Sequence, residues 1–497
     1  MSVIKHLFVL MMENRSFDHL LGFSELPGVA APDPRWGMAA DAPDRAPQDP
    51  LHEFENVRDQ IAGSPPMSGF RQQAYWPVSG QGVGAGRLPV LTTLARQYCL
   101  FDNWYASMPG PTWPNRFFVH AGSSGGLDNS PSAATTIESE TIDSLSFSFR
   151  NGTVFERLES AGRRWRVYHD DLFPQVLAIK HMVDPFRINN DRFSFVRDGG
   201  RELLVSDLAN GYDVDYTFIE PNYGLMSGGF ENGNSQHPRG SIAAGEKFIQ
   251  YIYESIRNSP VWAESLLFIT YDEHGGFFDH RAPPAAVVPA DGSQNHQRAQ
   301  HPQSFAFDQL GVRVPSIAIS PWIPTGALGS QLFPGQSFDH TNIIRTALEL
   351  GGGLEPLTAR DAAATSIAGI CSLATMRTDP ADTPARLWLP DAGIRAAGVA
   401  PAAPTAIENA TVEADGMMKG FTRIAMSLDL SIASELSVAP IAREHASFSR
   451  GVVIDTAAPA PTRGPGAAVP TNQQALDYIR AVAARVQRTR ATNQQRT

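Results

Sequence analysis

Short, almost continuously apolar segments alternate, over the first 350 residues, with segments in which apolar residues recur about every three to four positions. The apolar segments are typical of strands buried on both faces, and the spaced pattern is typical of amphipathic helices. The expected strands cover residues 4–12, 165–168, 216–219, 266–271 and 314–319, and the expected helices cover 89–98, 114–121, 242–256 and 341–350. The alternation predicts an α/β fold with a doubly wound, mainly parallel sheet and helices on both faces.

Three polar segments interrupt this alternation. Residues 24–66 are rich in Pro, Asp and Ala, residues 122–150 in Ser, Gly and Thr, and residues 282–308 in Pro, Gln and His. Long segments of this kind in a compact enzyme are either disordered or form loops around a functional site. We favour loops around a site, because segments with chemically reactive residues adjoin each of them.

The character of the chain changes after about residue 375, where Ala/Pro-rich stretches at 397–405 and 456–470 resemble linkers. We therefore expect a main domain over residues 1–375 and a C-terminal extension over 376–497. The last segment begins at Thr471, a plausible N-cap, and places apolar residues on one helical stripe. This terminal helix is expected to pack on the main domain or on another subunit.

The charge balance restricts the class of partner. The chain has 40 basic and 51 acidic residues, and no Lys/Arg cluster stands out in its first 480 residues. Nucleic-acid binding depends on a basic footprint, so nucleic acid is not an expected partner. No apolar run approaches the roughly 20 residues of a membrane-spanning helix, so we expect at most peripheral contact with a membrane.

The two cysteines and the N-terminus do not determine the cellular compartment of the protein. Cys99 and Cys371 could form one bridge or remain two buried thiols. The first ten residues run towards Glu13 without a small-residue cleavage site or a twin arginine, so no export signal is expected. As written the chain would be cytoplasmic, or secreted or periplasmic if a signal had been removed.

Polar residues follow two of the expected strands at the point where each strand ends. Glu13 and Asn14 follow the first strand, and Asp272 and Glu273 follow the strand at 266–271. Ligands bind beyond the carboxyl ends of strands in open α/β sheets, and carboxylate and amide oxygens suit a divalent cation. The alternatives are an ordinary turn with solvated polar residues for the first pair and an incidental acid pair in a glycine turn for the second.

A third segment offers a nucleophile. Pro114 fits the first turn of a helix, which puts Thr112 near a helix N-terminus, where backbone N–H groups and the helix dipole favour an anion. Metal coordination could activate the Thr112 hydroxyl as a nucleophile. The alternative is that Thr112 simply caps the helix.

Two histidines could transfer protons. His237 follows a Gly-rich stretch on a loop before the helix at 242–256, and its pKa near neutrality suits proton donation to a leaving alkoxide. His52, in the polar insertion, is a weaker candidate of the same type. For either residue the alternative is a structural or solvated histidine.

Taken together, these segments resemble the bacterial phosphoesterase family that contains the phosphatidylcholine-type phospholipases C and related acid phosphatases, within the alkaline phosphatase superfamily. The resemblance covers roughly residues 3–350 and runs in order through 13–19 (ENRSFDH), 110–116 (GPTWPNR), 237–238 (HP), 271–276 (YDEHGG) and 311–315 (GVRVP). It implies an alkaline-phosphatase-like fold, one divalent metal ion and a covalent phospho-enzyme. The ion could be Mg²⁺, Mn²⁺, Ca²⁺ or Zn²⁺.

The same resemblance implies a role for individual residues. The metal ligands would be Glu13, Asn14, Asp272 and Glu273, with Thr112 as both ligand and nucleophile. The catalytic histidines would be His237 and, less directly aligned, His52. We further expect Asn115, Arg116 and His274 to bind the substrate.

The expected function is phospholipase C-type hydrolysis of a phosphodiester, on the head-group side of a phospholipid, through a phospho-threonine. Threonine in a Gly-Pro-Thr setting resembles the phospholipase C branch, because serine is usual in the acid phosphatase branch. A choline head group would need aromatic faces, and the aromatic residues near these segments are Trp36, Tyr75, Trp76, Trp104, Tyr105 and Trp113. The alternatives are an acid phosphatase acting on soluble monoesters and a non-catalytic phosphate- or metal-binding protein.

Overall fold

The computed structural model describes residues 3–73, 76–84, 86–131, 142–143, 146–188, 191–224, 229–293, 305–387, 421, 424–425, 428, 477–486 and 488. The Ala/Pro-rich stretches at 397–405 and 456–470, and Tyr75, lie outside this part of the chain.

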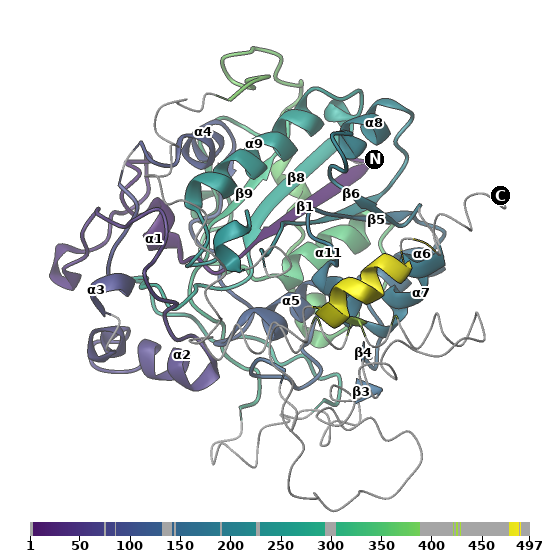
Figure 1. Ribbon diagram of the computed structural model, residues 1–497. Helices are drawn as coiled ribbons and strands as arrows, with labels where there is room; N and C mark the ends of the chain where they lie inside the picture. Colours follow the sequence, from purple (N-terminus) through teal and green to yellow (C-terminus); the bar gives the residue numbers. More distant parts are fainter. Residues whose placement is uncertain are drawn as a thin grey trace, which may run out of the picture.

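One sheet of eight strands runs through the described part of the chain, in the order β10-β2-β9-β8-β1-β7-β5-β6 (Figure 1). The strands are β1 (His6–Met12), β2 (Cys99–Leu100), β5 (Trp165–His169), β6 (Phe193–Phe195), β7 (Tyr216–Glu220), β8 (Ser265–Tyr271), β9 (Ser316–Ile319) and β10 (Ala327–Leu328), and a separate hairpin joins β3 (Ile142–Asp143) to β4 (Ser146–Phe147). The neighbouring strands β8, β1, β7, β5 and β6 are parallel to one another, whereas β9 is antiparallel to both β8 and β2. The predicted mainly parallel sheet is confirmed.

Helices cover both faces of the sheet, as predicted (Figure 1). Helices α4 (Pro89–Gln97) and α8 (Leu203–Ala209) contact α9 (Ile242–Arg257) on one face, whereas α5 (Thr112–Ala121), α6 (Val154–Ser160) and α12 (Ala359–Ala363) contact α11 (Thr341–Leu350) on the other. The remaining helices are α1 (Phe17–Leu21), α2 (Phe54–Ile61), α3 (Trp76–Ser79), α7 (Lys180–Ile188) and α10 (Gly329–Leu332), with 3-10 turns at η1 (Pro34–Trp36), η2 (Ser68–Gln72), η4 (Gln175–Ala178), η6 (Phe230–Asn232), η7 (Trp262–Glu264) and η8 (Ala368–Ile370).

The buried carboxylate of Glu246 on α9 fixes the start of α4. The residue that precedes α4, Leu88, has no side chain that could cap the helix. Instead the backbone N–H groups of Val90 and Leu91 donate to Glu246 over 2.7 and 3.1 Å. Burial raises the pKa of Glu246 to about 8 despite these two bonds. A helix of one layer is thus capped by its neighbour in the same layer.

The register of the central strands sets the position of the polar residues that follow them. Met12, the last residue of β1, lies opposite Tyr271, the last residue of β8. All residues of both strands are buried, so the polar residues that follow them stand beyond the carboxyl ends of the strands. Glu13 and Asp272 therefore emerge side by side at the carboxyl end of the sheet.

Parts of the C-terminal extension pack on the same hydrophobic core as the sheet. Residues 477–486 are helical, within the terminal helix that the sequence predicts, and Tyr478, Ile479 and Val482 are fully buried. Phe421 is also buried, with its ring centroid 6.2 Å from that of Trp113 on α5. Phe421 therefore packs against the helix that begins at Thr112.

None of the helices in the described residues combines the length and apolar character that crossing a membrane requires. The two cysteines of the chain are free thiols, with Cys99 buried and Cys371 partly buried. Burial, the largest influence on each, raises the pKa of both thiols, to about 12 for Cys371.

Candidate active site

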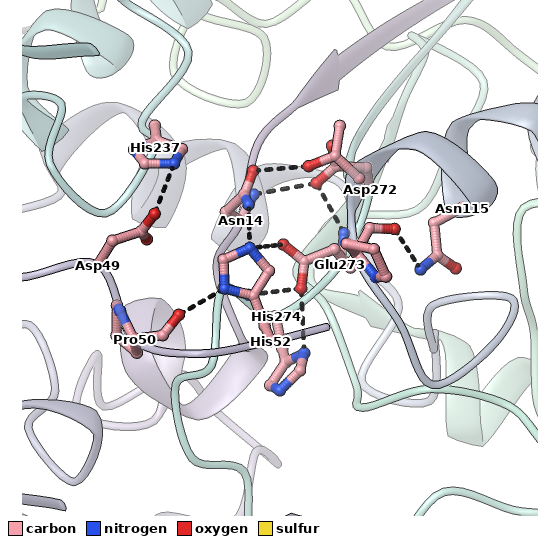
Figure 2. Close-up of polar contacts among 12 residues, drawn as sticks. Asn14, Asp49, Pro50, His52, Asn115, His237, Asp272, Glu273 and His274 are labelled. Atoms are coloured by element: carbon pink, nitrogen blue, oxygen red, sulfur yellow. Dashed lines mark hydrogen bonds and ion pairs between the residues drawn. The ribbon is translucent and has the colours of Figure 1, made fainter. Parts of the chain in front are cut away.

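Asn14 joins three segments that are distant in the sequence (Figure 2). Its backbone N–H donates to Asp272 Oδ1 over 3.0 Å, and its side-chain oxygen accepts a hydrogen bond from Thr112 Oγ1 over 3.3 Å. Its side-chain nitrogen lies 3.1 Å from His52 Nε2. Asn14 has a φ of 57°, a left-handed conformation that asparagine tolerates better than most residues. Asn14, the second residue after β1, is thus in contact with residues from three other parts of the predicted site.

The glycine pair after Glu273 allows the second segment to approach Asn14. Gly275 and Gly276 have φ values of 62° and 69°, in the left-handed region. A Cβ atom on Gly275 would lie 2.1 Å from the backbone oxygen of Asn14, and one on Gly276 would lie 2.6 Å from Pro50 Cβ. A side chain at Gly275 would push the two strand-end segments apart, and one at Gly276 would push the polar insertion away. The chain thus turns directly after Asp272 and Glu273.

Thr112 is the first residue of α5, and its side chain does not cap that helix. Pro111 occupies the N-cap position, and no side chain makes the capping hydrogen bond. The Thr112 hydroxyl points instead to Asn14, and the residue is fully buried. The structure therefore does not support the simple capping role, and it places the predicted nucleophile beside a predicted metal ligand.

Asn115 shapes the loop in front of Thr112. Its side-chain oxygen accepts from the backbone N–H of Met108 over 3.1 Å, and its nitrogen donates to the carbonyl oxygens of Gly110 and Pro111 over 3.0 and 3.1 Å. Both ends of the amide are therefore used within the loop. Substrate binding by Asn115 stays a prediction.

Arg116 is a fully buried cation at the same site. Its Nε donates to Asp272 Oδ2 over 2.9 Å, its Nη2 donates to the Met12 carbonyl over 3.2 Å, and its Nη1 has no hydrogen-bond partner among the described residues. Burial is the largest influence and lowers its pKa, but nearby acidic groups, Tyr223 and Asp272 foremost, outweigh burial and leave the pKa raised. Arg116 therefore stays charged and neutralises Asp272.

His52 reaches the site from the polar insertion. Its Nδ1 lies 2.5 Å from the carbonyl oxygen of Pro50, which can only accept, so Nδ1 carries the hydrogen. Its Nε2 faces the Asn14 amide and lies 3.7 Å from Glu273 Oε1 (Figure 2). The less directly aligned histidine thus lies among the predicted metal ligands.

His274 lies on the other side of Glu273. Its Nδ1 is 3.1 Å from Glu273 Oε2, and its Nε2 is 2.9 Å from Gln60 Oε1. Burial, and then the nearby His52, hold the pKa of His274 well below its ordinary value. Its predicted contact with the substrate stays a prediction.

His237 contacts a different carboxylate. Its Nε2 lies 3.5 Å from Asp49 Oδ2, its Nδ1 accepts from the backbone N–H of Arg239 over 3.3 Å, and its ring stacks on Phe230 at a centroid distance of 3.5 Å. Figure 2 shows His237 and Asp49 to the left of Asn14, and His52 and His274 below it. These three contacts hold His237 in the loop that follows the Gly-rich stretch.

The segments that follow β1 and β8 also form a second cluster of acidic and histidine side chains, separate from the one around Asn14. Among the described residues, Asp18, Asp279 and His280 present ligand atoms within 4.8 Å of one another, and the carboxylates of Glu13, Asp272 and Glu273 do not form so tight a group. Arg313 lies in this second cluster and donates to Asp18 Oδ1 over 2.9 Å and to Asp279 Oδ2 over 3.1 Å.

The second cluster already contains a cation that bonds to both of its carboxylates. Asp18 Oδ2 also lies 2.7 Å from His280 Nδ1, and burial raises the pKa of Asp279 although the Arg313 charge opposes that shift. We therefore assign the cluster a structural role, in which Arg313 ties the ends of the two motifs together.

Two residues near the site were missed by sequence reasoning. Glu220, the last residue of β7, accepts from the backbone N–H of Gln175 over 2.6 Å and from Tyr223 Oη over 2.6 Å, and Tyr223 lies under the Arg116 guanidinium. An acid at the end of an apolar strand was the available signal for Glu220. Gln60, the partner of His274, lies on α2 and gave no such signal.

The aromatic residues near the site segments pack mainly on one another. The rings of Trp36 and Trp76 contact Phe278, and the Arg71 guanidinium lies over both indoles. Trp104 and Trp113 are fully buried, Tyr105 is 6% exposed and Tyr75 lies outside the described residues. A pocket for a choline cation stays a prediction.

A model of the Phosphoesterase family matches residues 4–350 of the chain. Non-specific phospholipase C3 of Arabidopsis thaliana is 32% identical over 76% of this chain and 75% of its own length, and non-specific phospholipase C6 of the same plant is 34% identical over 76% and 74%. Non-hemolytic phospholipase C of Pseudomonas aeruginosa is 26% identical over 71% of this chain and 54% of its own length.

Similar solved structures are more distant. A protein in the alkaline phosphatase superfamily from Vibrio parahaemolyticus has a TM-score of 0.33 and 12% identity over 73% of this chain and 72% of its own. The phosphonate monoester hydrolase of Agrobacterium radiobacter has a TM-score of 0.32 and 10% identity over 74% and 77%. These values are too low to carry an argument about the site.

Proposed function

Because this chain belongs to the phosphoesterase family and is a hydrolase of phosphoric esters, we propose that it is a metal-dependent phospholipase C that acts through a covalent intermediate on Thr112. The observation that carries this proposal is the meeting of Thr112, Asn14 and Asp272 at the carboxyl end of the sheet. A hydroxyl at a helix N-terminus beside carboxylate and amide oxygens suits attack on a phosphate ester.

The residues around Asn14 fit a single divalent cation. Glu13, Asp272 and Glu273 are three fully buried carboxylates, against which Arg116 sets one positive charge. Buried carboxylates close to one another repel, and a cation among them removes that cost. Their oxygens and that of Asn14 are hard donors, suited to Mg²⁺, Ca²⁺ or Mn²⁺ and acceptable to Zn²⁺. Glu13, Asn14, Asp272 and Glu273 would hold the ion.

When bound, the cation would lower the pKa of the Thr112 hydroxyl and neutralise phosphoryl oxygens. Thr112 Oγ1 attacks phosphorus, and the bond from phosphorus to the glycerol oxygen breaks. The leaving oxygen takes a proton and departs as diacylglycerol, while the phosphorylated head group stays on Thr112. Water then attacks the same phosphorus, which returns the hydroxyl to Thr112 and releases the head-group phosphate.

His52 is the better placed histidine for the proton transfers. Its Nδ1 hydrogen is held by Pro50, so Nε2 can take the proton that Thr112 loses and give it to the leaving oxygen. The Nε2 of His237 faces Asp49 instead, which favours a role in binding phosphate or in orienting the loop.

Arg116 is suited to bind a phosphoryl oxygen. Thr112 and Arg116 are four residues apart on α5 and thus lie on one face of that helix. The buried Nη1 of Arg116 has a hydrogen to donate and no acceptor among the described residues. An anionic phosphate at Thr112 would supply that acceptor.

Two observations favour a phosphodiester over a monoester. The relatives reported above carry the name phospholipase C, from both plant and bacterium. Threonine rather than serine stands at the nucleophile position, in the Gly-Pro-Thr setting typical of that branch.

A paired assay tests the proposal. The protein is assayed on phosphatidylcholine vesicles and on p-nitrophenyl phosphate, each before and after EDTA treatment and after return of single divalent ions. We expect diacylglycerol and phosphocholine from the vesicles, loss of both with EDTA and recovery with at least one ion. Activity on the monoester alone would favour the acid phosphatase alternative, and full activity after metal removal would contradict metal dependence.

A further inference from the structure

Helix α2 carries a polar residue where its pattern calls for an apolar one. The residues of α2 that face the protein are Phe54, Val57 and Gln60, and Gln60 is only 2% exposed. Burying an amide is costly unless both of its ends are hydrogen-bonded. The two ends of Gln60 are bonded, and the identity of the two partners fixes its orientation.

The Gln60 amide can have only one orientation. Its nitrogen donates to the carbonyl oxygen of Leu51 over 2.7 Å, and a carbonyl oxygen can only accept. The side-chain oxygen must therefore face His274 Nε2, at 2.9 Å. Since that oxygen can only accept, His274 Nε2 carries a hydrogen. Leu51 thus fixes, through Gln60, a hydrogen on the Nε2 of His274.

The other nitrogen of His274 is left facing a carboxylate. Its Nδ1 lies 3.1 Å from Glu273 Oε2, and both groups are buried. Because Gln60 uses the hydrogen on Nε2, Nδ1 is the ring nitrogen that can bind a cation, and it lies beside a carboxylate oxygen. A cation bound to both atoms would hold them at such a separation. The separation is close to that of two ligands on one ion, given metal–ligand distances of about 2.0–2.2 Å to each.

We propose that His274 is a nitrogen ligand of the metal centre and that Gln60 is the residue that positions it. A histidine that binds a metal usually donates its other ring hydrogen to a carbonyl or carboxylate oxygen, as His274 does to Gln60. The inference rests on the proposed metal site, to which it adds a ligand beyond the oxygen donors. Nitrogen ligation favours a borderline ion such as Zn²⁺ or Mn²⁺ over Mg²⁺ or Ca²⁺.

Pulsed electron paramagnetic resonance of the protein loaded with Mn²⁺ tests the ligand directly. The echo modulation of a bound histidine nitrogen should be present in the unaltered protein and in His52→Asn, and absent in His274→Asn. If the modulation persists in His274→Asn, or is absent from the unaltered protein although Mn²⁺ binds, the inference is overturned. If Mn²⁺, Zn²⁺ and the other divalent ions all fail to bind, the metal-dependent function itself fails, so the two failures are distinguishable.

The role of Gln60 has its own readout in the metal-free protein. Nitrogen NMR spectra of histidine-labelled protein at pH 8, recorded through long-range proton–nitrogen couplings, should show the ring hydrogen of His274 on Nε2. Gln60→Met removes the acceptor, so the ring hydrogen should move to Nδ1 in that variant. Gln60→Glu keeps an acceptor and should restore the original pattern. Zn²⁺ affinity should fall about 10- to 100-fold in Gln60→Met. Gln72→Met, the same change at an exposed position on η2, is the control and should change neither quantity. An unchanged His274 pattern in Gln60→Met would refute the positioning role.

Discussion

The Thr112 hydroxyl donates a 3.3 Å hydrogen bond to the side-chain oxygen of Asn14, across 98 positions of the sequence. Asn14 follows the end of β1 and Thr112 is the first residue of α5, so this bond joins the carboxyl end of the sheet to α5. A variant that lacks only this hydroxyl therefore distinguishes a catalytic role of Thr112 from a role in stabilising the fold. Thr112→Val should lower the turnover number roughly 10⁴- to 10⁶-fold, because the nucleophile is lost. Metal affinity and the free energy of unfolding should change little. A variant that keeps full turnover would refute Thr112 as nucleophile.

Breaking the buried pair between Arg116 and Asp272 should destabilise the protein strongly. Arg116→Met leaves Asp272 charged and buried, which typically costs about 3–5 kcal/mol of unfolding free energy. A bound divalent ion should recover part of that loss, so added Zn²⁺ or Mn²⁺ should raise the denaturation midpoint more in Arg116→Met than in the unaltered protein. Equal shifts in both proteins would argue against a cation near Asp272.

The two carboxylate clusters should respond differently to neutralisation. Asp272→Asn should weaken metal binding, because this side chain belongs to the proposed centre. Asp279→Asn should leave the metal stoichiometry unchanged, because Arg313 already bonds to both carboxylates of its cluster. Titration calorimetry of both variants with one ion measures this contrast. The opposite result would place the ion in the cluster formed by Asp18, Asp279 and His280.

His52 should matter most when the leaving group needs a proton. His52→Gln should lower turnover of a phospholipid about 10²- to 10⁴-fold, because the alkoxide of diacylglycerol is a poor leaving group. The loss should be much smaller with a p-nitrophenyl ester of phosphocholine, whose leaving group departs without protonation. Equal losses on both substrates would indicate that His52 acts on binding and not on proton transfer.

His120 should make the fold sensitive to acid. It is fully buried on α5, and burial, with help from Arg116 and His340, lowers its pKa to about 3. The unfolded chain takes up a proton near the ordinary histidine pKa of about 6.5 while the folded protein does not, so stability is lost as pH falls through this window towards 3. The linkage amounts to about 2 kcal/mol between pH 7 and pH 5. His120→Phe, which suits the neighbouring Phe155 and Phe218, should make denaturation less dependent on pH in that range. An unaltered slope would show that His120 is protonated in the folded state.

The sheet and its main helices could be predicted because burial imposes a pattern on the sequence. Strands such as β1 and β8 are buried on both faces and therefore read as apolar runs, and α9 shows a helical stripe. The shortest strands, such as β2 and β10, hold two residues each, too few for a pattern. The antiparallel direction of β9 has no local signal either, because direction depends on the path of the connecting loop.

The site could be predicted where its residues adjoin such elements. Glu13, Asn14 and Asp272 follow strands, so their meeting is implied by the parallel sheet. His52 and Gln60 come from the polar insertion, and their positions depend on how that insertion folds back, which no periodicity reports. The sequence could not show that Asp18 and Asp279 form a separate cluster, because each lies only a few residues beyond a predicted metal ligand.

The most direct test of the account is the mass of the tryptic peptide that contains Thr112, after the protein is mixed with phosphatidylcholine and quenched in acid. The account predicts a phosphocholine adduct on Thr112 that is absent in Thr112→Val and absent after EDTA treatment. A bare phosphoryl group formed only from monoesters would indicate the acid phosphatase chemistry. Turnover of phosphatidylcholine with the adduct on another residue, or with no adduct under any quench time, would contradict Thr112 as the nucleophile.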